Sequence, residues 1–122
     1  MLTRTAIYEG RVTPGREDEF FALVADRLEP IWRQFPHVRA VRVQRVLDAD
    51  ADAAPIAMIM EMDYSDRSSM EASLASPIRS AAHAATLEVM SLFEGRFYHL
   101  VAEPDAFGPA DAETPLSAPT AG

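Results

Sequence analysis

The amino-acid sequence predicts an α+β fold, a split βαβ sandwich in which two helices cover one face of a four-stranded antiparallel sheet. Three observations lead to this prediction. Four segments have the apolar alternation or β-branched content of strands, and two repeat apolar residues every three to four positions, as amphipathic helices do. Turn signals separate these segments, and their order is strand, helix, strand, strand, helix, strand.

The first half of the chain has the pattern of a strand, a helix and a second strand. Residues 3–12 are rich in β-branched and aromatic types and stop at a turn signal in residues 13–15. Residues 17–35 place apolar side chains three and four positions apart, which predicts a helix that Pro30 kinks or splits. Residues 38–47 alternate between apolar and polar types, so we expect the second strand there.

The third strand is expected at residues 56–64, after an acidic hairpin connection at residues 48–55. One face of this strand is wholly apolar or aromatic and consists of Ile56, Met58, Met60, Met62 and Tyr64. The other face begins with Ala57 and Ile59, so we expect both faces to be covered.

Two helices and a strand complete the second half. Asp66 is a candidate N-cap for a short helix, and Ser76 and Pro77 have the pattern of a second helix start. The longer helix that follows is rich in alanine, which permits close packing on the sheet, and we expect Gly95 to end it. Residues 96–103 then form the fourth strand, with apolar residues on both faces.

The sheet face away from the helices carries too much apolar surface to lie in water. The third and fourth strands both present apolar side chains on it, and an exposed patch of that size is uncommon on a monomer. An isologous homodimer is the simplest arrangement that covers such a face with a second sheet. We therefore expect the protein to work as a homodimer.

Length and composition indicate one domain, residues 1–103, followed by a tail, residues 104–122, that is rich in Pro, Ala and acidic residues. The chain has 122 residues and no cysteine, which excludes disulfides and thiolate zinc sites and fits a cytoplasmic location. The formal net charge of -8 disfavours nucleic acid and anionic membranes as partners. No export signal or membrane-spanning run is visible.

Several motifs along the chain carry a family resemblance. They are residues 10–15 (GRVTPG) with the acidic, Phe-containing helix start at 17–20, residues 60–66 (MEMDYSD), residues 70–77 (MEASLASP) and residues 93–95 (FEG). Together they resemble the EthD-like branch of the dimeric α+β barrel superfamily, whose subunits have a ferredoxin-like βαββαβ fold. The resemblance extends over the predicted domain and leaves out the tail.

This resemblance implies a homodimer with face-to-face sheets and, in each subunit, a cleft between sheet and helices that holds a small, mostly apolar organic molecule. It also implies a link to the degradation of small organic compounds. Related branches include cofactor-independent monooxygenases, polyketide cyclases, muconolactone isomerases and haem-degrading enzymes. The polyketide-cyclase branch keeps a histidine and a tyrosine where this chain has Arg79 and Ser73, so cyclase activity is not supported.

Three side chains are the candidate catalytic residues: His83, Tyr8 and His99. Arg79 and His83 lie four positions apart on the predicted long helix, so they share one face and could bind an anion or act as acid and base. His99 lies in the fourth strand among apolar residues, where an imidazole suits proton transfer, and the Tyr8 phenol could orient a ligand. Solvated surface for Arg79 and His83, and a core or interface position for His99, are the ordinary alternatives.

A second set of side chains is expected to bind a ligand together with Arg79. Glu61 and Tyr64 are polar groups on the third strand, and Met60 and Trp32 could form the apolar wall of a pocket. Core packing is the alternative for Met60 and Trp32. Glu61 could instead pair with Arg42 on a neighbouring strand.

No metal or cofactor is expected. The histidines at positions 37, 83 and 99 lack the short spacing of metal ligands on one element, and no Gly-rich phosphate loop is present. Three functions remain open: an EthD-like protein that binds a small apolar or weakly acidic compound in a degradative pathway, a cofactor-independent monooxygenase or isomerase, and a non-catalytic dimerising module without a cavity.

Overall fold

The computed structural model describes residues 1–104, which form a four-stranded sheet with helices on one side. The elements in chain order are β1 (Leu2–Val12), α1 (Glu17–Leu23), η1 (Val24–Leu28), α2 (Glu29–Trp32), β2 (Ala40–Arg45), β3 (Ile56–Tyr64), α3 (Arg67–Leu74), α4 (Ile78–Met90) and β4 (Phe93–Ala102). The element η1 is a turn of π-helix. The predicted tail, apart from residue 104, lies outside the described residues, and the division into domain and tail stays a prediction.

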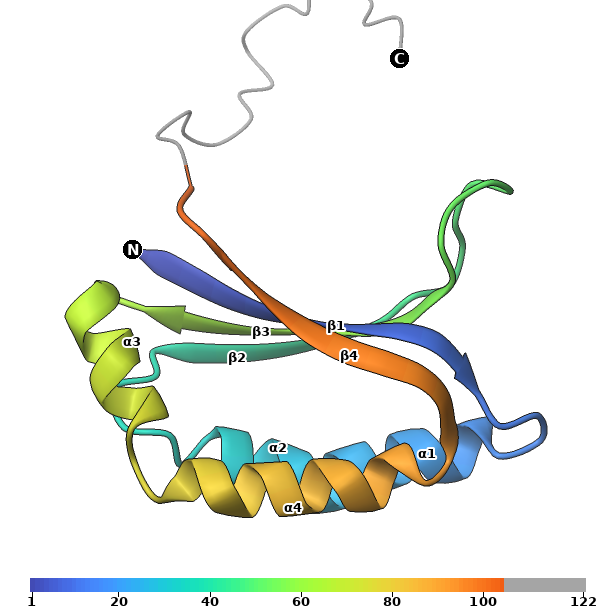
Figure 1. Cartoon of the computed structure of the whole chain (residues 1–122), viewed down its shortest axis with the longest axis horizontal. Coiled ribbons are helices and arrows are strands. Elements are labelled where there is room, and N and C mark those ends of the chain that lie inside the picture. The colour runs from blue at the N-terminus through green and yellow to red at the C-terminus, as the bar shows by residue number, and fades with distance from the viewer. Residues whose placement is uncertain (105–122) are drawn as a thin grey trace, which may run out of the picture.

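The strands are antiparallel and lie in the order β2-β3-β1-β4, so the first and third strands of the chain occupy the centre. The helical segments α1, η1, α2 and α4 cover one face of the sheet, and α3 lies at one end of it (Figure 1). This arrangement confirms the predicted α+β class and the ferredoxin-like sandwich. Asp66 caps α3 as predicted, because its carboxylate accepts a hydrogen bond from Ser69 N at 2.8 Å. Within residues 1–104, no helix has the length and apolar content needed to cross a bilayer.

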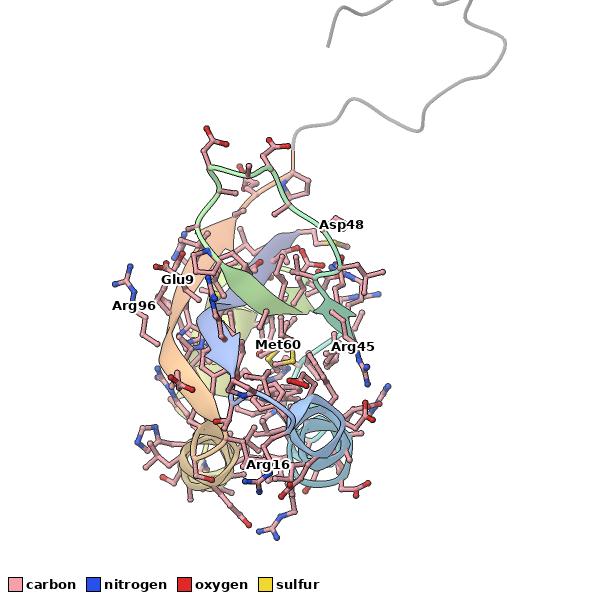
Figure 2. The ribbon with its side chains drawn as sticks, turned by 90° about the vertical axis from the view of Figure 1, so that its right-hand side faces the viewer. Glu9, Arg16, Arg45, Asp48, Met60 and Arg96 are labelled. Atoms are coloured by element: carbon pink, nitrogen blue, oxygen red, sulfur yellow. The ribbon has the colours of Figure 1, made fainter. Side chains whose placement is uncertain are left out.

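The core lies between the sheet and the helices and uses alternate residues of each strand. Figure 2 views these layers end-on and shows Met60 between the sheet and the helices. Tyr8 of β1 lies opposite Phe97 of β4 in the strand register, so both side chains share this face. The apolar face predicted for the third strand is buried here, with Met58, Met60, Met62 and Tyr64.

The helix predicted at residues 17–35 is divided into α1, η1 and α2. Pro30 divides it, as predicted, because proline has no N–H to donate and its ring conflicts with the carbonyl group four residues earlier. The backbone widens into the π turn of η1, and α2 carries Pro30 in its first turn. The predicted end at residue 35 is wrong: helix stops at Trp32, and residues 33–35 form turns.

Gly95 does not end the long helix, contrary to the prediction. α4 ends at Met90, and Gly95 lies inside β4 opposite Gly10 of β1. The two glycines have φ angles of 154° and 139°, and a Cβ on either would collide with a backbone carbonyl of the opposite strand. The pair therefore permits close approach of β1 and β4, and β4 begins at Phe93, before the predicted start at residue 96.

The sheet face away from the helices is polar beside β2 and mixed beside β4, where Arg96 pairs with Glu9 and Leu100 faces outward. Arg42 pairs with Glu61, as anticipated, and with Asp63, at N–O distances of 3.1 and 2.7 Å, and Thr3 donates to Asp63 at 2.8 Å. On β4, Leu100 is 53% exposed, so the expectation that both faces of this strand are buried is wrong for the single chain. β4 is an edge strand, and among residues 1–104 no other element covers its outer face.

Candidate functional site

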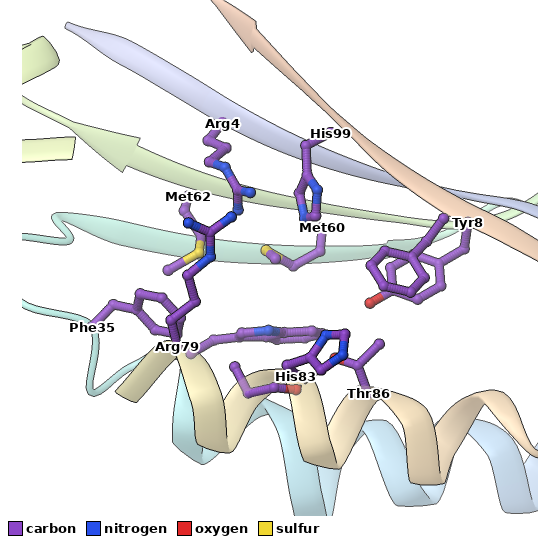
Figure 3. A pocket seen from close by; sticks show the side chains of 12 residues that line it. Arg4, Tyr8, Phe35, Met60, Met62, Arg79, His83, Thr86 and His99 are labelled. Carbon is purple, nitrogen blue, oxygen red and sulfur yellow. Dashed lines mark hydrogen bonds between the residues drawn. The ribbon is translucent and has the colours of Figure 1, made fainter. Parts of the chain in front are cut away.

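A cavity of about 110 Å³ lies between the helix-facing side of the sheet and the helices α2 and α4 (Figure 3). An engineered closed cavity of about 150 Å³ binds benzene. The present space is smaller but partly open, so one ring or a short branched chain is the largest group that it suits. The wall contains no acidic residue, and within residues 1–104 no three His, Asp or Glu side chains form a group that could hold a metal ion. The wall consists of Arg4, Tyr8, Trp32, Phe35, Met60, Met62, Arg79, Ala82, His83, Thr86, Phe97 and His99.

Strand alternation directs the sheet residues of the wall toward the helices. Arg4 and Tyr8 are four residues apart on β1, so their side chains project from the same face. Met62 of β3 lies opposite Arg4, and Phe97 of β4 lies opposite Tyr8. His99 follows Phe97 on the same face of β4, and its ring packs edge-on against Phe97 with 5.8 Å between the ring centroids.

The helix α4 provides the polar residues of the opposite wall. Arg79, His83 and Thr86 are separated by four and three positions, so one face of the helix presents all three to the cavity. Ala82 lies among them and is buried, and its small side chain leaves room for the cavity. Thr86 donates its hydroxyl to the Ala82 carbonyl at 2.7 Å, which fixes the direction of the threonine side chain.

The π turn η1 explains how Trp32 reaches the cavity. An α-helix has 3.6 residues per turn, so residues spaced by four drift around its surface, and a wider π turn takes up this drift. The apolar stripe therefore stays directed at the sheet as far as Trp32, which forms part of the cavity wall. The buried members of the stripe are Phe20, Val24, Leu28 and Trp32.

Two wall residues, Tyr8 and His99, are neutral at physiological pH, and their surroundings further stabilise the neutral forms. Burial raises the pKa of Tyr8 to about 12, and an interaction with Thr86 offsets this only in part. Partial burial and the positive charges of Arg4 and Arg79 lower the pKa of His99 to about 4. Tyr8 is thus a phenol that can donate a hydrogen bond, and His99 is an imidazole that can accept a proton. An imidazole with such a low pKa is a weak base and can take a proton only from an acidic group.

Arg4 and Arg79 bring two positive charges to one end of the cavity, from β1 above and α4 below (Figure 3). Burial and the charge of Arg79 lower the pKa of Arg4. Within residues 1–104, all ion pairs lie elsewhere and neither arginine has a carboxylate partner. Arg79 donates one long hydrogen bond, 3.5 Å, to the Leu74 carbonyl. This end of the cavity is therefore suited to an anion.

The structure brings together most of the residues that the sequence indicated. Six of the eight line the cavity: Tyr8, Trp32, Met60, Arg79, His83 and His99. Glu61 lies on the opposite face of the sheet, paired with Arg42. Tyr64 is buried outside the cavity wall, with its hydroxyl 2.9 Å from the Ser73 hydroxyl. The catalytic and binding roles assigned to all eight stay predictions.

Arg4 is the most consequential wall residue that the sequence analysis missed. Its distance of four residues from Tyr8 on a predicted strand was a usable signal, because such a spacing places two side chains on one face. The meeting of Arg4 with Arg79 could not be inferred, since it depends on how a central strand lies over a helix far along the chain. The other wall residues without a prediction are Phe35, Met62, Ala82, Thr86 and Phe97.

The fold and the cavity define a small ferredoxin-like α+β protein with a pocket between sheet and helices, and solved structures share this fold. An EthD family protein from Bacillus halodurans is 19% identical, with a TM-score of 0.66 over 86% of this chain and 99% of that one. A dimeric protein of ferredoxin-like fold from Bacteroides fragilis is 9% identical, with a TM-score of 0.60 over 84% and 94%. An antibiotic biosynthesis monooxygenase is 15% identical, with a TM-score of 0.57 over 86% and 99%.

These likenesses confirm, at the level of the fold, the resemblance to EthD-like and related barrel proteins that the sequence motifs indicated. No protein-family profile and no curated protein matches the sequence. At such low identities the solved structures establish a shared fold and not a shared activity.

Proposed function

We propose that the chain is an EthD-like protein of the cytoplasm that binds a small, mostly apolar or weakly acidic organic molecule in the cavity, with an accessory or enzymatic role in the degradation of such compounds. The observation that carries the proposal is the cavity itself. Six of its twelve wall residues carry polar or charged groups, and these converge from both layers on an apolar surface, a combination that marks a candidate small-molecule site. The shared fold with an EthD family protein supports the same assignment.

The apolar part of the wall can adapt to its ligand. Trp32 offers a flat face, and the Met60 and Met62 side chains are unbranched and flexible, so they fit ligands of different shapes. The third hypothesis, a dimerising module with no cavity, is not supported, because the wall residues leave a partly open space between the sheet and the helices.

Fluorescence of Trp32 tests the binding proposal, because this residue is the only tryptophan of the chain and forms part of the wall. Titration with benzamide, a one-ring neutral probe, should change the emission in a saturable way. Ala82→Phe fills the cavity and should abolish the response. Ala84→Phe is the matched control, since Ala84 lies on the exposed side of the same helix and its replacement leaves the cavity open. Equal responses of the two variants would refute binding in this cavity.

We further propose that the subunit forms a homodimer through the outer face of the sheet. Leu100 is 53% exposed there, and one solved structure of this fold is described as dimeric. Native mass spectrometry should show two subunits and any copurified compound. Leu100→Asp should yield monomers, whereas Leu87→Asp, at a leucine 58% exposed on α4, should leave the dimer intact. A wild-type monomer would refute the proposal.

A second candidate is an enzyme of the cofactor-independent monooxygenase or isomerase type. Tyr8, His83 and His99 all face the cavity, which is the arrangement that proton transfer to or from a bound molecule requires (Figure 3). Neutral His99 can accept a proton from an acidic substrate, and the two arginines can stabilise the anion that remains. The solved structure of an antibiotic biosynthesis monooxygenase shares the fold. Turnover of a copurified compound should fall in Tyr8→Phe and His83→Gln, and unchanged turnover in both would count against this candidate.

A further inference from the structure

The two arginines of the cavity stand out against the charge of the whole chain. The formal net charge is -8, yet the wall has two guanidinium groups and no carboxylate. Elsewhere in residues 1–104, five arginines pair with acidic side chains, namely Arg16, Arg27, Arg33, Arg42 and Arg96. The acidic partners of these five arginines lie away from the cavity, and no acidic residue lines its wall, so the wall keeps its positive charge.

The geometry of this pair suits a planar anion. Arg4 extends from the sheet and Arg79 from α4, so their guanidinium groups approach one end of the cavity from opposite sides (Figure 3). The positive charges of half-buried Arg4 and exposed Arg79 repel each other, and an anion between them reduces the repulsion. A guanidinium group presents its N–H donors in a flat fork that matches the two oxygens of a carboxylate.

The remainder of the cavity limits what carries the negative charge. Beyond the arginines the wall has an apolar part, with Trp32, Met60 and Phe97, that offers no partner to a charge. The neutral polar groups of Tyr8, Thr86 and His99, together with His83, lie beside it. An inorganic anion would leave this surface without a partner, while a neutral hydrocarbon would leave the arginines without one. A molecule with one apolar group and one carboxylate satisfies both parts.

On the basis of the proposed function, we infer that the ligand is the anion of a small carboxylic acid. Its carboxylate lies between Arg4 and Arg79, and its apolar group, of the size of one ring, lies against Trp32 and Met60. The inference deepens the proposed function by naming the class of ligand.

Benzoate and benzamide test this inference, because they have nearly the same shape and differ in charge. In titrations followed by Trp32 fluorescence at pH 7, benzoate should bind at least about tenfold more tightly than benzamide, which corresponds to about 1.4 kcal/mol. Arg4→Gln and Arg79→Gln should each reduce benzoate affinity about tenfold while changing benzamide affinity less than about twofold. Arg67→Gln is the matched control, since it makes the same change in net charge at the start of α3, outside the wall.

The possible results separate this inference from the proposed function. Equal affinities for benzoate and benzamide would overturn the carboxylate inference and leave small-molecule binding in place. Loss of benzoate affinity to the same extent in Arg67→Gln would also overturn it, because the effect would then come from net charge. Competition by inorganic phosphate at the same concentration as benzoate would show a general anion site and contradict the inference. Absence of binding for both probes would overturn the inference and the proposed function together.

Discussion

The buried hydrogen bond between Tyr64 of β3 and Ser73 of α3 attaches the short helix to the end of the sheet. Both side chains are fully buried, and their hydroxyl oxygens lie 2.9 Å apart. Removal of one partner leaves the other hydroxyl buried and unpaired, which costs about 1–3 kcal/mol. We therefore expect Tyr64→Phe and Ser73→Ala each to lower the free energy of unfolding by about 1–2 kcal/mol. The double variant leaves no unpaired hydroxyl, so its loss should be smaller than the sum by about 1 kcal/mol.

Urea denaturation followed by circular dichroism measures these losses, at one protein concentration because the proposed dimerisation would make stability depend on concentration. Strictly additive losses would refute the reasoning, since they would mean that the two hydroxyls do not interact. The same variants examine Tyr64 as a ligand-binding residue. Tyr64 lies outside the cavity wall, so Tyr64→Phe should bind benzoate and benzamide as the wild type does. A tenfold loss of affinity would instead support the role that the sequence suggested.

Three further predictions concern the backbone, a helix cap and a histidine. Gly10→Ala should lower the free energy of unfolding by more than about 3 kcal/mol in urea denaturation, because the new Cβ meets the Glu94 carbonyl at positive φ. Gly15→Ala, at positive φ but in open space, should cost only about 1–2 kcal/mol, and similar losses would refute the steric argument. Asp66→Ala should cost about 1 kcal/mol in thermal unfolding through loss of the bond to Ser69 N, whereas Asp66→Asn should keep most of it. The pKa of His99 is about 4 in the folded protein and 6.5 ordinarily, so the unfolded state binds the proton first as the pH falls. Stability should thus decline from pH 6.5 to about 4, and His99→Gln should decline less; identical pH profiles would contradict this.

The strands and the long helix were predictable because their signals are local. Apolar alternation locates β3 at residues 56–64 without error, and the alanine-rich repeat locates α4, whose Arg79 and His83 share one face as their spacing requires. The cap at Asp66 is equally local, since the side chain bonds to a backbone group three residues away.

The sequence-based predictions were wrong or incomplete where a residue's role depends on a distant segment. From its place in the sequence, Gly95 has the pattern of a helix end. In the structure it lies opposite Gly10, and the close approach of β1 and β4 at this point requires glycine at both positions. The π turn of η1 is likewise not visible in the sequence, because it is defined by how the stripe ending at Trp32 must face the sheet. The role of Arg4 was not predictable for the same reason, because Arg79, the second positive charge at that end of the cavity, lies in another layer of the fold.

The charges of the cavity explain its protonation states and restrict what can bind. Partial burial is the main cause of the low His99 pKa of about 4, and the charges of Arg4 and Arg79 add to it, because a protonated His99 would be a third positive charge beside them. Tyr8 has a pKa of about 12 and stays neutral, so it supplies no negative charge. At neutral pH both side chains are therefore uncharged, and the charge of this part of the cavity comes from Arg4 and Arg79. No carboxylate of residues 1–104 lines the cavity, so in the inferred complex the carboxylate of the ligand supplies the balancing charge.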